Sequence, residues 1–104
     1  MSVRSQHGPG WIPLLDRVVK RLAELDPEGQ VVAAKEKMGS MRIHVRSTAT
    51  QRDLQSLYRW VEDESLSICE WCGEPGSMRV WGFRCSVRCD YCDDGIMLGV
   101  MQCK

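Results

Sequence analysis

The spacing of hydrophobic residues near the N-terminus predicts an amphipathic helix. After Trp11, hydrophobic side chains recur every three or four positions, and the positions between them are mostly charged. These hydrophobic residues are Leu14, Leu15, Val18, Val19, Leu22 and Leu25. Pro13 suits the first turn of such a helix. The helix is expected to end at Asp26, because the residue before a proline disfavours the helical conformation.

Residues 30–46 alternate instead, which predicts a β hairpin with one buried face. Gly39 and Ser40 are expected to be the central residues of its turn, because a type II′ turn has glycine at the first central position. In that register Met38 lies opposite Met41. The mostly hydrophobic face then consists of Val32, Ala34, Glu36, Met38, Met41, Ile43 and Val45. The other face becomes strongly basic towards the turn and consists of Val31, Ala33, Lys35, Lys37, Arg42, His44 and Arg46.

A second amphipathic helix is predicted after the hairpin. Thr50 and Asp53 have the spacing of a helix N-cap pair. The inner face of this helix consists of Leu54, Leu57, Tyr58, Val61 and Ser65. Trp60 lies outside that stripe. The helix runs almost directly into Cys69, so we expect the C-terminal segment to pack against the helix without a linker.

Four cysteines near the C-terminus predict a structural metal site. Cys69 and Cys72 form one C-x2-C pair, and sixteen residues separate this pair from the second one, Cys89 and Cys92. Each pair directs two sulfurs towards one ion, and four thiolates complete the tetrahedron that Zn²⁺ accepts. Iron is the alternative metal, since four thiolates also suit a rubredoxin-like site.

Two further cysteines leave alternatives for the ligand set. Replacement of one ligand by Cys85 or Cys103 is the competing arrangement. The two C-x2-C pairs are favoured because they close a tetrahedron most simply. Disulfides are disfavoured, since paired C-x2-C spacing in a cytosolic chain is typical of metal binding. A thioredoxin-type redox role is also disfavoured, because no βαβ pattern surrounds either pair.

The charge distribution favours a structural role for the metal. Residues 1–60 contain ten Lys or Arg and six Asp or Glu, whereas residues 61–104 contain four and eight. A four-cysteine zinc centre adds about two negative charges to the acidic half. Zinc modules that bind nucleic acid usually surround the metal with basic residues, since phosphate contacts dominate the affinity. The metal half would repel phosphate, so we expect the zinc to stabilise the fold.

Two surfaces are candidates for binding. The basic face of the hairpin suits either nucleic-acid phosphates or an acidic protein surface, and it equally fits a solvated outer face. Its charged residues are Lys35, Lys37, Arg42, His44 and Arg46. Trp and Met are enriched at protein interfaces. The candidates for such an interface are Trp60, Trp71 and Trp81, with Met97, Leu98 and Met101. The same residues also fit a cover over the zinc site and the second helix.

Four short motifs occur in order along the chain. They are Gly10-Trp11-Ile12-Pro13-Leu14-Leu15, Lys35-Glu36-Lys37-Met38-Gly39-Ser40-Met41-Arg42, Cys69-Glu70-Trp71-Cys72-Gly73-Glu74-Pro75-Gly76 and Arg88-Cys89-Asp90-Tyr91-Cys92. This set resembles a family of small bacterial and phage-borne proteins with Gly-Trp-x-Pro-Leu-Leu, Lys-Glu-Lys-Phe-Gly-x-Leu-Arg and Cys-x-x-Cys-Gly-x-Pro-Gly motifs. Members often carry histidine at the position of Cys92, which supports metal ligation there. The resemblance implies a phage or prophage setting.

The fold is predicted to be α+β: a helix, a β hairpin, a second helix, then a four-cysteine zinc-ribbon-like module. Residues 1–10 are expected to form a disordered arm and residues 11–68 the helix–hairpin–helix part. The metal module, residues 69–104, is expected to pack on that part as one compact unit. No hydrophobic run approaches the roughly 20 residues of a membrane span, and the N-terminus lacks the hydrophobic region of a secretory signal. We therefore expect a cytoplasmic protein.

These features predict a non-enzymatic, zinc-stabilised protein-interaction module. The chain has two histidines, His7 and His44, and no recognisable Ser-His-Asp set, phosphate-binding loop or open three-ligand zinc site. We expect the partner to be a host protein or assembly. The protein would then be a phage-encoded regulator or inhibitor of a host machine, of the anti-defence (anti-CRISPR-like) type. Nucleic-acid binding through the basic hairpin face is the alternative, and a metal-dependent subunit of an enzyme is a third hypothesis.

Overall fold

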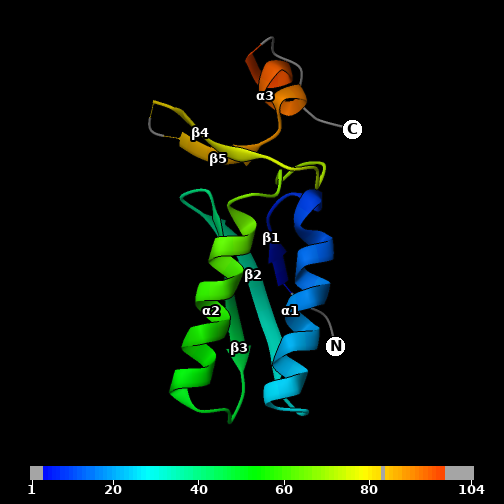
Figure 1. Cartoon of the computed structure of the whole chain (residues 1–104), viewed down its shortest axis with the longest axis vertical. Helices are drawn as coiled ribbons and strands as arrows, with labels where there is room; N and C mark the ends of the chain where they lie inside the picture. Colours follow the sequence, from blue (N-terminus) through cyan, green and yellow to red (C-terminus); the bar gives the residue numbers. More distant parts are fainter. Residues whose placement is uncertain (1–3, 83, 98–104) are drawn as a thin grey trace.

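Two helices and a three-stranded sheet form the lower part of the molecule in Figure 1, and a small β hairpin with a third helix forms the upper part. The computed structural model describes residues 4–82 and 84–97. The elements are β1 (Arg4–Gln6), η1 (Pro9–Trp11), α1 (Ile12–Leu25), β2 (Gln30–Lys37), β3 (Ser40–Arg46), α2 (Gln51–Ser65), β4 (Ser77–Trp81), β5 (Arg84–Arg88) and α3 (Asp90–Met97). The predicted α+β class, with a C-terminal cysteine cluster, is confirmed.

Both predicted helices form, and local signals define their ends. α1 begins after Trp11 with Pro13 in its first turn, and it ends directly before Asp26. α2 begins after Thr50, whose Oγ1 accepts a hydrogen bond from the backbone N–H of Asp53 at 3.1 Å. Both helices pack on the same side of the sheet (Figure 1). Within the described residues, no helix has the length and hydrophobicity needed to cross a membrane.

The hairpin forms with a different turn from the predicted one. Its central residues are Met38 and Gly39, with φ of 54° and 89°, so both are left-handed as in a type I′ turn. The Glu36 carboxylate accepts a hydrogen bond from the Gly39 N–H at 2.7 Å, which stabilises this turn. Glu36 therefore pairs with Met41, not with Ile43. Because side chains alternate with a period of two, this shift of two residues leaves the predicted faces unchanged beside the turn.

A β-bulge corrects the prediction at the other end of β2. The register shifts between Val31 and Ala33, and Val31 pairs with Val45. The extra residue reverses which side chains point inward beyond the bulge. Val31 is consequently buried, with 4% of its surface exposed, whereas Val32 is only partly buried. The expectation that Val32 lies on the hydrophobic face and Val31 on the basic face was wrong.

The N-terminal segment is ordered from residue 4 onwards, in contrast to the predicted disordered arm. β1 pairs in parallel with β2, with Arg4 beside Ala33. The chain then enters η1, where Gly10 and Trp11 are buried. Residues 1–3 of the predicted arm lie outside the described residues. A strand of three exposed residues has no hydrophobic alternation, so the sequence pattern does not reveal it.

The core lies between the two helices and the inner face of the sheet. Its fully buried members are Trp11, Leu14, Val18, Leu22, Val31, Ala34, Met41, Leu57 and Val61. One polar group in this region is satisfied internally: the Ser65 hydroxyl accepts from the Met41 N–H at 2.9 Å and donates to the Glu62 carbonyl at 2.8 Å. This pair of bonds links the C-terminal end of α2 to β3, and it gives both the Met41 N–H and the Ser65 O–H an acceptor.

The segment before α1 fastens the cysteine-bearing end of the molecule to the helix–sheet part. The Gly10 N–H donates to the Glu70 carbonyl at 2.7 Å, and the Trp11 indole N–H donates to the Ile68 carbonyl at 2.9 Å. Gly10 lies so close to the backbone of Cys69 and Gly73 that a Cβ at this position would overlap both. The first cysteine loop is therefore positioned by direct main-chain contact.

Gly10→Ala is expected to destabilise the protein by about 2–3 kcal/mol, because the new methyl group meets backbone atoms that cannot rotate away. Urea unfolding monitored by tryptophan fluorescence measures the change. Gly82→Ala is the matched control: its Cβ would meet no atom within 4 Å, so its cost is limited to the positive φ of 59°, about 1 kcal/mol. Equal losses for the two variants would contradict the close-contact argument.

Candidate metal centre

The structure brings together the sulfur atoms of Cys69, Cys72, Cys89 and Cys92, and all four lie within 4.8 Å of one another. In a tetrahedral zinc site with Zn–S bonds of about 2.3 Å, the sulfurs stand about 3.8 Å apart. The Cys72 and Cys89 Sγ atoms are 3.7 Å apart. The cluster therefore fits a four-coordinate metal ion such as zinc.

The first cysteine pair lies in a tight loop closed by main-chain hydrogen bonds. Ile68 and Pro75 form an antiparallel bridge across its base, and the Cys69 N–H donates to the Glu74 carbonyl at 2.7 Å. The Gly73 N–H donates to the Cys69 carbonyl at 2.9 Å. Gly73 has φ of 84°, a conformation that glycine adopts without strain. The loop therefore turns both sulfurs to the same side.

The second pair lies at the junction of β5 and α3. Cys89 follows the last residue of β5, and Cys92 lies in the first turn of α3. The Cys92 N–H points to the Cys89 Sγ at 3.4 Å, and the Asp93 N–H donates to the Cys89 carbonyl at 2.9 Å. The ligands thus come from a loop and from the start of a helix, with a β hairpin between them.

Two ion pairs fix the helix start that carries Cys92. The Arg79 guanidinium on β4 contacts the Asp93 carboxylate at 2.7 Å and the Asp90 carboxylate at 2.9 Å. These contacts raise the pKa of Arg79, with the hydrogen bond to Asp90 as the largest cause. Asp90 and Asp93 also lie in the first turn of α3, where negative charge is favoured by the helix dipole.

The sulfurs differ in how strongly their surroundings favour the thiolate. Burial raises the pKa of Cys69, but hydrogen bonds from the backbone of Cys72, Cys89 and Trp71 outweigh burial and lower it overall. Burial and the neighbouring Cys89 and Cys69 raise the pKa of Cys72 to about 11. Loss of the Cys72 proton is therefore unfavourable without a cation, and a bound dication removes that cost as the thiol releases its proton.

A buried arginine lies beside the cysteine cluster. Only 9% of the Arg88 surface is exposed, and its guanidinium stacks on the Trp71 ring at 4.9 Å. Its Nε donates to the Ser86 hydroxyl at 2.9 Å. Burial lowers the pKa of Arg88, while the nearby Glu70 and Cys69 act in the opposite direction. Arg88 thus supplies positive charge next to a centre that carries about two negative charges when zinc is bound.

Glu70 and Arg88 were not among the residues predicted for the site. The buried Glu70 carboxylate accepts hydrogen bonds from the Gly8 N–H at 3.0 Å and the Ser86 hydroxyl at 3.2 Å. Both residues adjoin a ligand in the sequence, Glu70 after Cys69 and Arg88 before Cys89. Their position next to a ligand is the one feature of the sequence that points to Glu70 and Arg88. It does not indicate that their side chains are buried.

The one other cysteine that the structure describes does not join the cluster. Cys85 lies on β5, partly buried, near Gly39 of the hairpin turn. It is not a member of the four-sulfur group, so the ligand set that uses Cys85 is disfavoured within the described residues. Cys103 lies outside the described residues.

The structure places most of the predicted basic residues on one exposed surface. Lys35, Lys37, His44 and Arg46 are exposed on the sheet face opposite the helices. Arg42 is half-buried, since its Nε donates to the Ser40 hydroxyl at 3.1 Å and lies 3.8 Å from the Glu62 carboxylate of α2. In the observed register Lys37 pairs with Ser40, and Lys35 pairs with Arg42.

The three tryptophans proposed for binding have different outcomes. Trp71 is partly buried against the cysteine cluster. Trp60 is partly buried against the core, and the guanidinium groups of Arg17 and Arg21 lie over its ring at 5.2 and 4.2 Å. Its contacts thus link α1 to α2 through cation–π interactions. The Trp81 side chain and the tail residues 98–101 lie outside what the structure describes.

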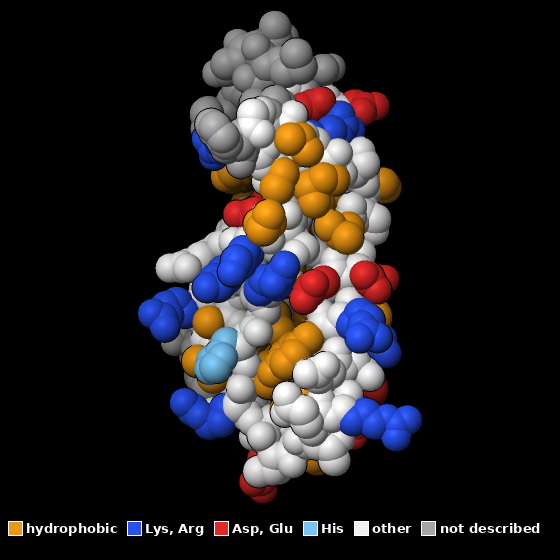
Figure 2. All heavy atoms as spheres, turned by 90° about the vertical axis from the view of Figure 1, so that its left-hand side faces the viewer, with side chains coloured by type: hydrophobic (Ala, Val, Ile, Leu, Met, Phe, Trp, Pro, Cys, Tyr) orange, Lys and Arg blue, Asp and Glu red, His pale blue; other side chains and the backbone are white. Residues whose placement is uncertain are grey.

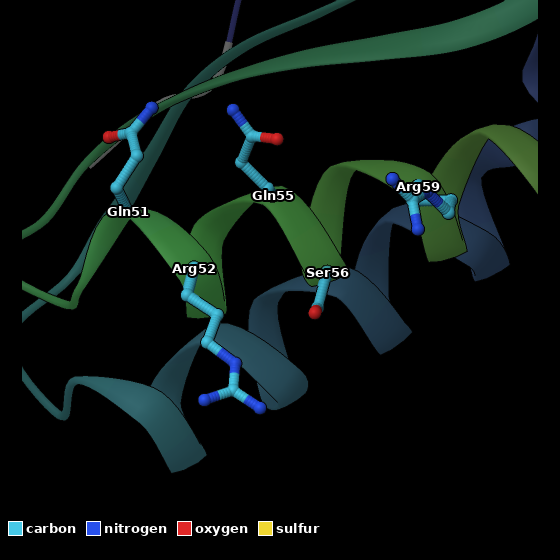
Figure 3. Close-up of a pocket in the computed structure, with 5 residues that line it drawn as sticks. All are labelled: Gln51, Arg52, Gln55, Ser56 and Arg59. Atoms are coloured by element: carbon cyan, nitrogen blue, oxygen red, sulfur yellow. The ribbon is translucent and has the colours of Figure 1, made fainter.

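A shallow groove on α2 carries no catalytic arrangement. It is lined by Gln51, Arg52, Gln55, Ser56 and Arg59. Figure 3 shows that the Gln51 and Gln55 side chains point to one side of the helix, whereas Arg52 and Ser56 point to the other. The lining groups diverge and include no general base. They lie on the first turns of α2, at the opposite end of the molecule from the cysteine cluster (Figure 1).

Comparison of the chain with protein-family models, curated proteins and solved structures finds no match in any of the three. Functional inference therefore rests on the residues of this chain.

We expect the purified protein to contain one zinc ion per chain and the Cys69→Ser variant to contain none, because three thiolates and a hydroxyl bind zinc far more weakly. Elemental analysis after gel filtration measures the metal content. Cys85→Ser is the matched control and should retain the ion. Zinc loss from Cys85→Ser, with retention in Cys69→Ser, would show that the ligands are different cysteines.

Arg88→Gln is expected to release zinc to a competing chelator about tenfold faster, because it removes a buried cation from the surroundings of the thiolates. A chromogenic chelator follows the release in real time. Arg84→Gln removes an exposed cation from the same strand and serves as the control. If Arg88→Gln releases zinc at the unchanged rate, the role of Arg88 is only to pack against Trp71.

Proposed function

We propose that this chain is a non-enzymatic, zinc-stabilised protein-interaction module, encoded by a phage or prophage, that regulates or inhibits a host machine as anti-defence proteins do. Four cysteines form a closed ligand set, which leaves no position for the water or substrate of a catalytic zinc. Zinc is favoured over iron because the chain has no partner redox motif. The metal then serves to hold a binding surface in place.

The observation that carries this proposal is a hydrophobic patch where the metal-binding end meets the sheet. We call it the seam patch: Met38 of the hairpin turn with Met78 and Val80 of β4, which are 71%, 39% and 69% exposed. The Met78 side chain lies against Gly39, directly beside Met38. Figure 2 views the molecule from the left-hand side of Figure 1. It shows hydrophobic side chains gathered in the upper half of the view, above a band of charged side chains.

The seam patch has the chemistry of a protein-binding site. Methionine side chains are flexible and polarizable, so they adapt to irregular hydrophobic partners. The patch joins residues from two parts of the chain, and the contacts of Gly10 and the metal site hold those parts together. A preorganised hydrophobic surface loses little conformational entropy on binding, which favours affinity. The expected occupant is a hydrophobic segment of a host protein.

A second candidate function is nucleic-acid binding through the open face of the sheet. The observation in its favour is the gathering of exposed cations on that face, from Lys35 and Lys37 on β2 and Arg46 on β3. This surface and the seam patch consist of different residues, charged in the first and hydrophobic in the second. Each function can therefore be tested by its own variants.

We expect Met38→Ser/Val80→Ser to reduce capture of the host partner at least tenfold, because two exposed anchors of the interface are lost. The measurement is affinity capture from nuclease-treated bacterial host lysate, with quantitative identification of retained proteins. Val19→Ser, which removes an exposed hydrophobic side chain from α1, is the matched control. The interface would be rejected if Val19→Ser reduced capture of the retained proteins as much as Met38→Ser/Val80→Ser does. It would also be rejected if the seam-patch variant captured the same proteins in the same amounts as the unchanged protein.

A further inference from the structure

The sheet leaves one face open to solvent. α1 and α2 both cover the side that carries Val31, Ala34 and Met41 (Figure 1). In the part of the chain that the structure describes, no helix covers the opposite side. The pairing register assigns to this open face Arg4, Gln6, Gln30, Ala33, Lys35, Lys37, Ser40, Arg42, His44 and Arg46.

The open face is positively charged across all three strands. β1 contributes Arg4, β2 contributes Lys35 and Lys37, and β3 contributes Arg46, all of them exposed. None of the residues that the register assigns to this face is Asp or Glu. Arg42 is the exception among the cations, since it turns towards Glu62. Four cations without a neighbouring anion on the same face make a surface that attracts polyanions.

The open face carries no large exposed hydrophobic side chain that could surround an anchor for a protein partner. The large hydrophobic residues that are exposed in the described part of the chain are Ile12, Val19, Leu25, Met38, Leu66, Met78, Val80 and Tyr91. None of them belongs to the open face. Binding energy at protein interfaces is concentrated in desolvated aromatic and arginine anchors set in hydrophobic surroundings. Charge alone suits phosphate groups better than an acidic protein.

The same face also lacks the features that read bases. It presents no Phe, Tyr or Trp, and His44 is its one aromatic ring, so it offers little surface on which unpaired bases could stack. It presents no helix that could enter a major groove. We infer that the open face of the sheet binds the phosphate backbone of double-stranded nucleic acid without regard to base sequence. This inference rests on the second candidate function.

The dimensions of the face suit a duplex backbone. Three strands span about 10 Å, and residues 33–37 extend about 14 Å along β2. Along one strand of a duplex the phosphates are ~3.4 Å apart, so about four phosphates pass over this length. This number matches the four exposed Lys and Arg side chains of the face. Four such contacts predict that binding weakens on the order of 100-fold between about 50 and 200 mM salt.

The test is fluorescence anisotropy with labelled DNA duplexes of about 20 base pairs in two unrelated sequences, and with one strand alone. We expect equal affinity for both duplexes and weaker binding of the single strand. Lys35→Glu/Lys37→Glu should weaken duplex binding at least tenfold. The control is Lys20→Glu/Arg52→Glu, which makes the same change in net charge on the exposed surfaces of α1 and α2 and should weaken binding less than threefold.

A neutral pair, Lys35→Gln/Lys37→Gln, keeps the test valid if charge reversal impairs folding, and it should give an intermediate loss. Equal weakening by the open-face and control variants would overturn the inference, as would preference for the single strand. Poly-glutamate is added as a competitor at the same concentration of charge as the duplex. If it displaces the duplex, the open face binds acidic proteins instead. Met38→Ser/Val80→Ser should leave duplex binding unchanged. The DNA-binding result is therefore independent of whether the seam patch binds a protein.

Discussion

The contact of Gly10 and Trp11 with the first cysteine loop is the interaction on which the arrangement of the molecule depends. Trp11 is fully buried in the core, and its indole also donates to the Ile68 carbonyl, so one side chain belongs to both parts of the structure. Gly10 lets two backbones approach closely enough for its N–H to reach the Glu70 carbonyl. Because that loop carries Cys69, the hydrophobic core and the metal ligands are positioned by the same few atoms.

Charge is distributed unevenly between the two ends of the molecule. A zinc ion bound by four thiolates leaves about two negative charges, and the buried Arg88 offsets part of them locally. The cations of the open sheet face keep their charge exposed, except for Arg42, which is drawn towards Glu62. The uncharged seam patch lies between these regions. Exposed positive charge thus lies on the open sheet face, whereas residues 61–104 have an excess of Asp and Glu over Lys and Arg.

Elements with a periodic pattern could be predicted from the sequence, and details that depend on distant contacts could not. Gly39 correctly indicated a hairpin, but the Glu36 carboxylate bonds to its N–H and Met38 takes a positive φ, which moves the turn by one residue. The bulge at Val32 leaves no mark in the pattern, since both of its neighbours are small hydrophobic residues. β1 forms because β2 offers an unpaired edge, not because its own residues favour a strand.

The sequence by itself determined the helices, the hairpin and the four cysteines that come together, because helix periods, turns and C-x2-C loops are local properties of the chain. Only the tertiary structure decided that Cys85 stays outside the cluster, since β5 directs it towards Gly39. It also decided that Arg4 joins the basic face and that Arg88 is buried beside the thiolates. Register, docking and burial depend on residues that are far apart in the sequence and adjacent only after folding.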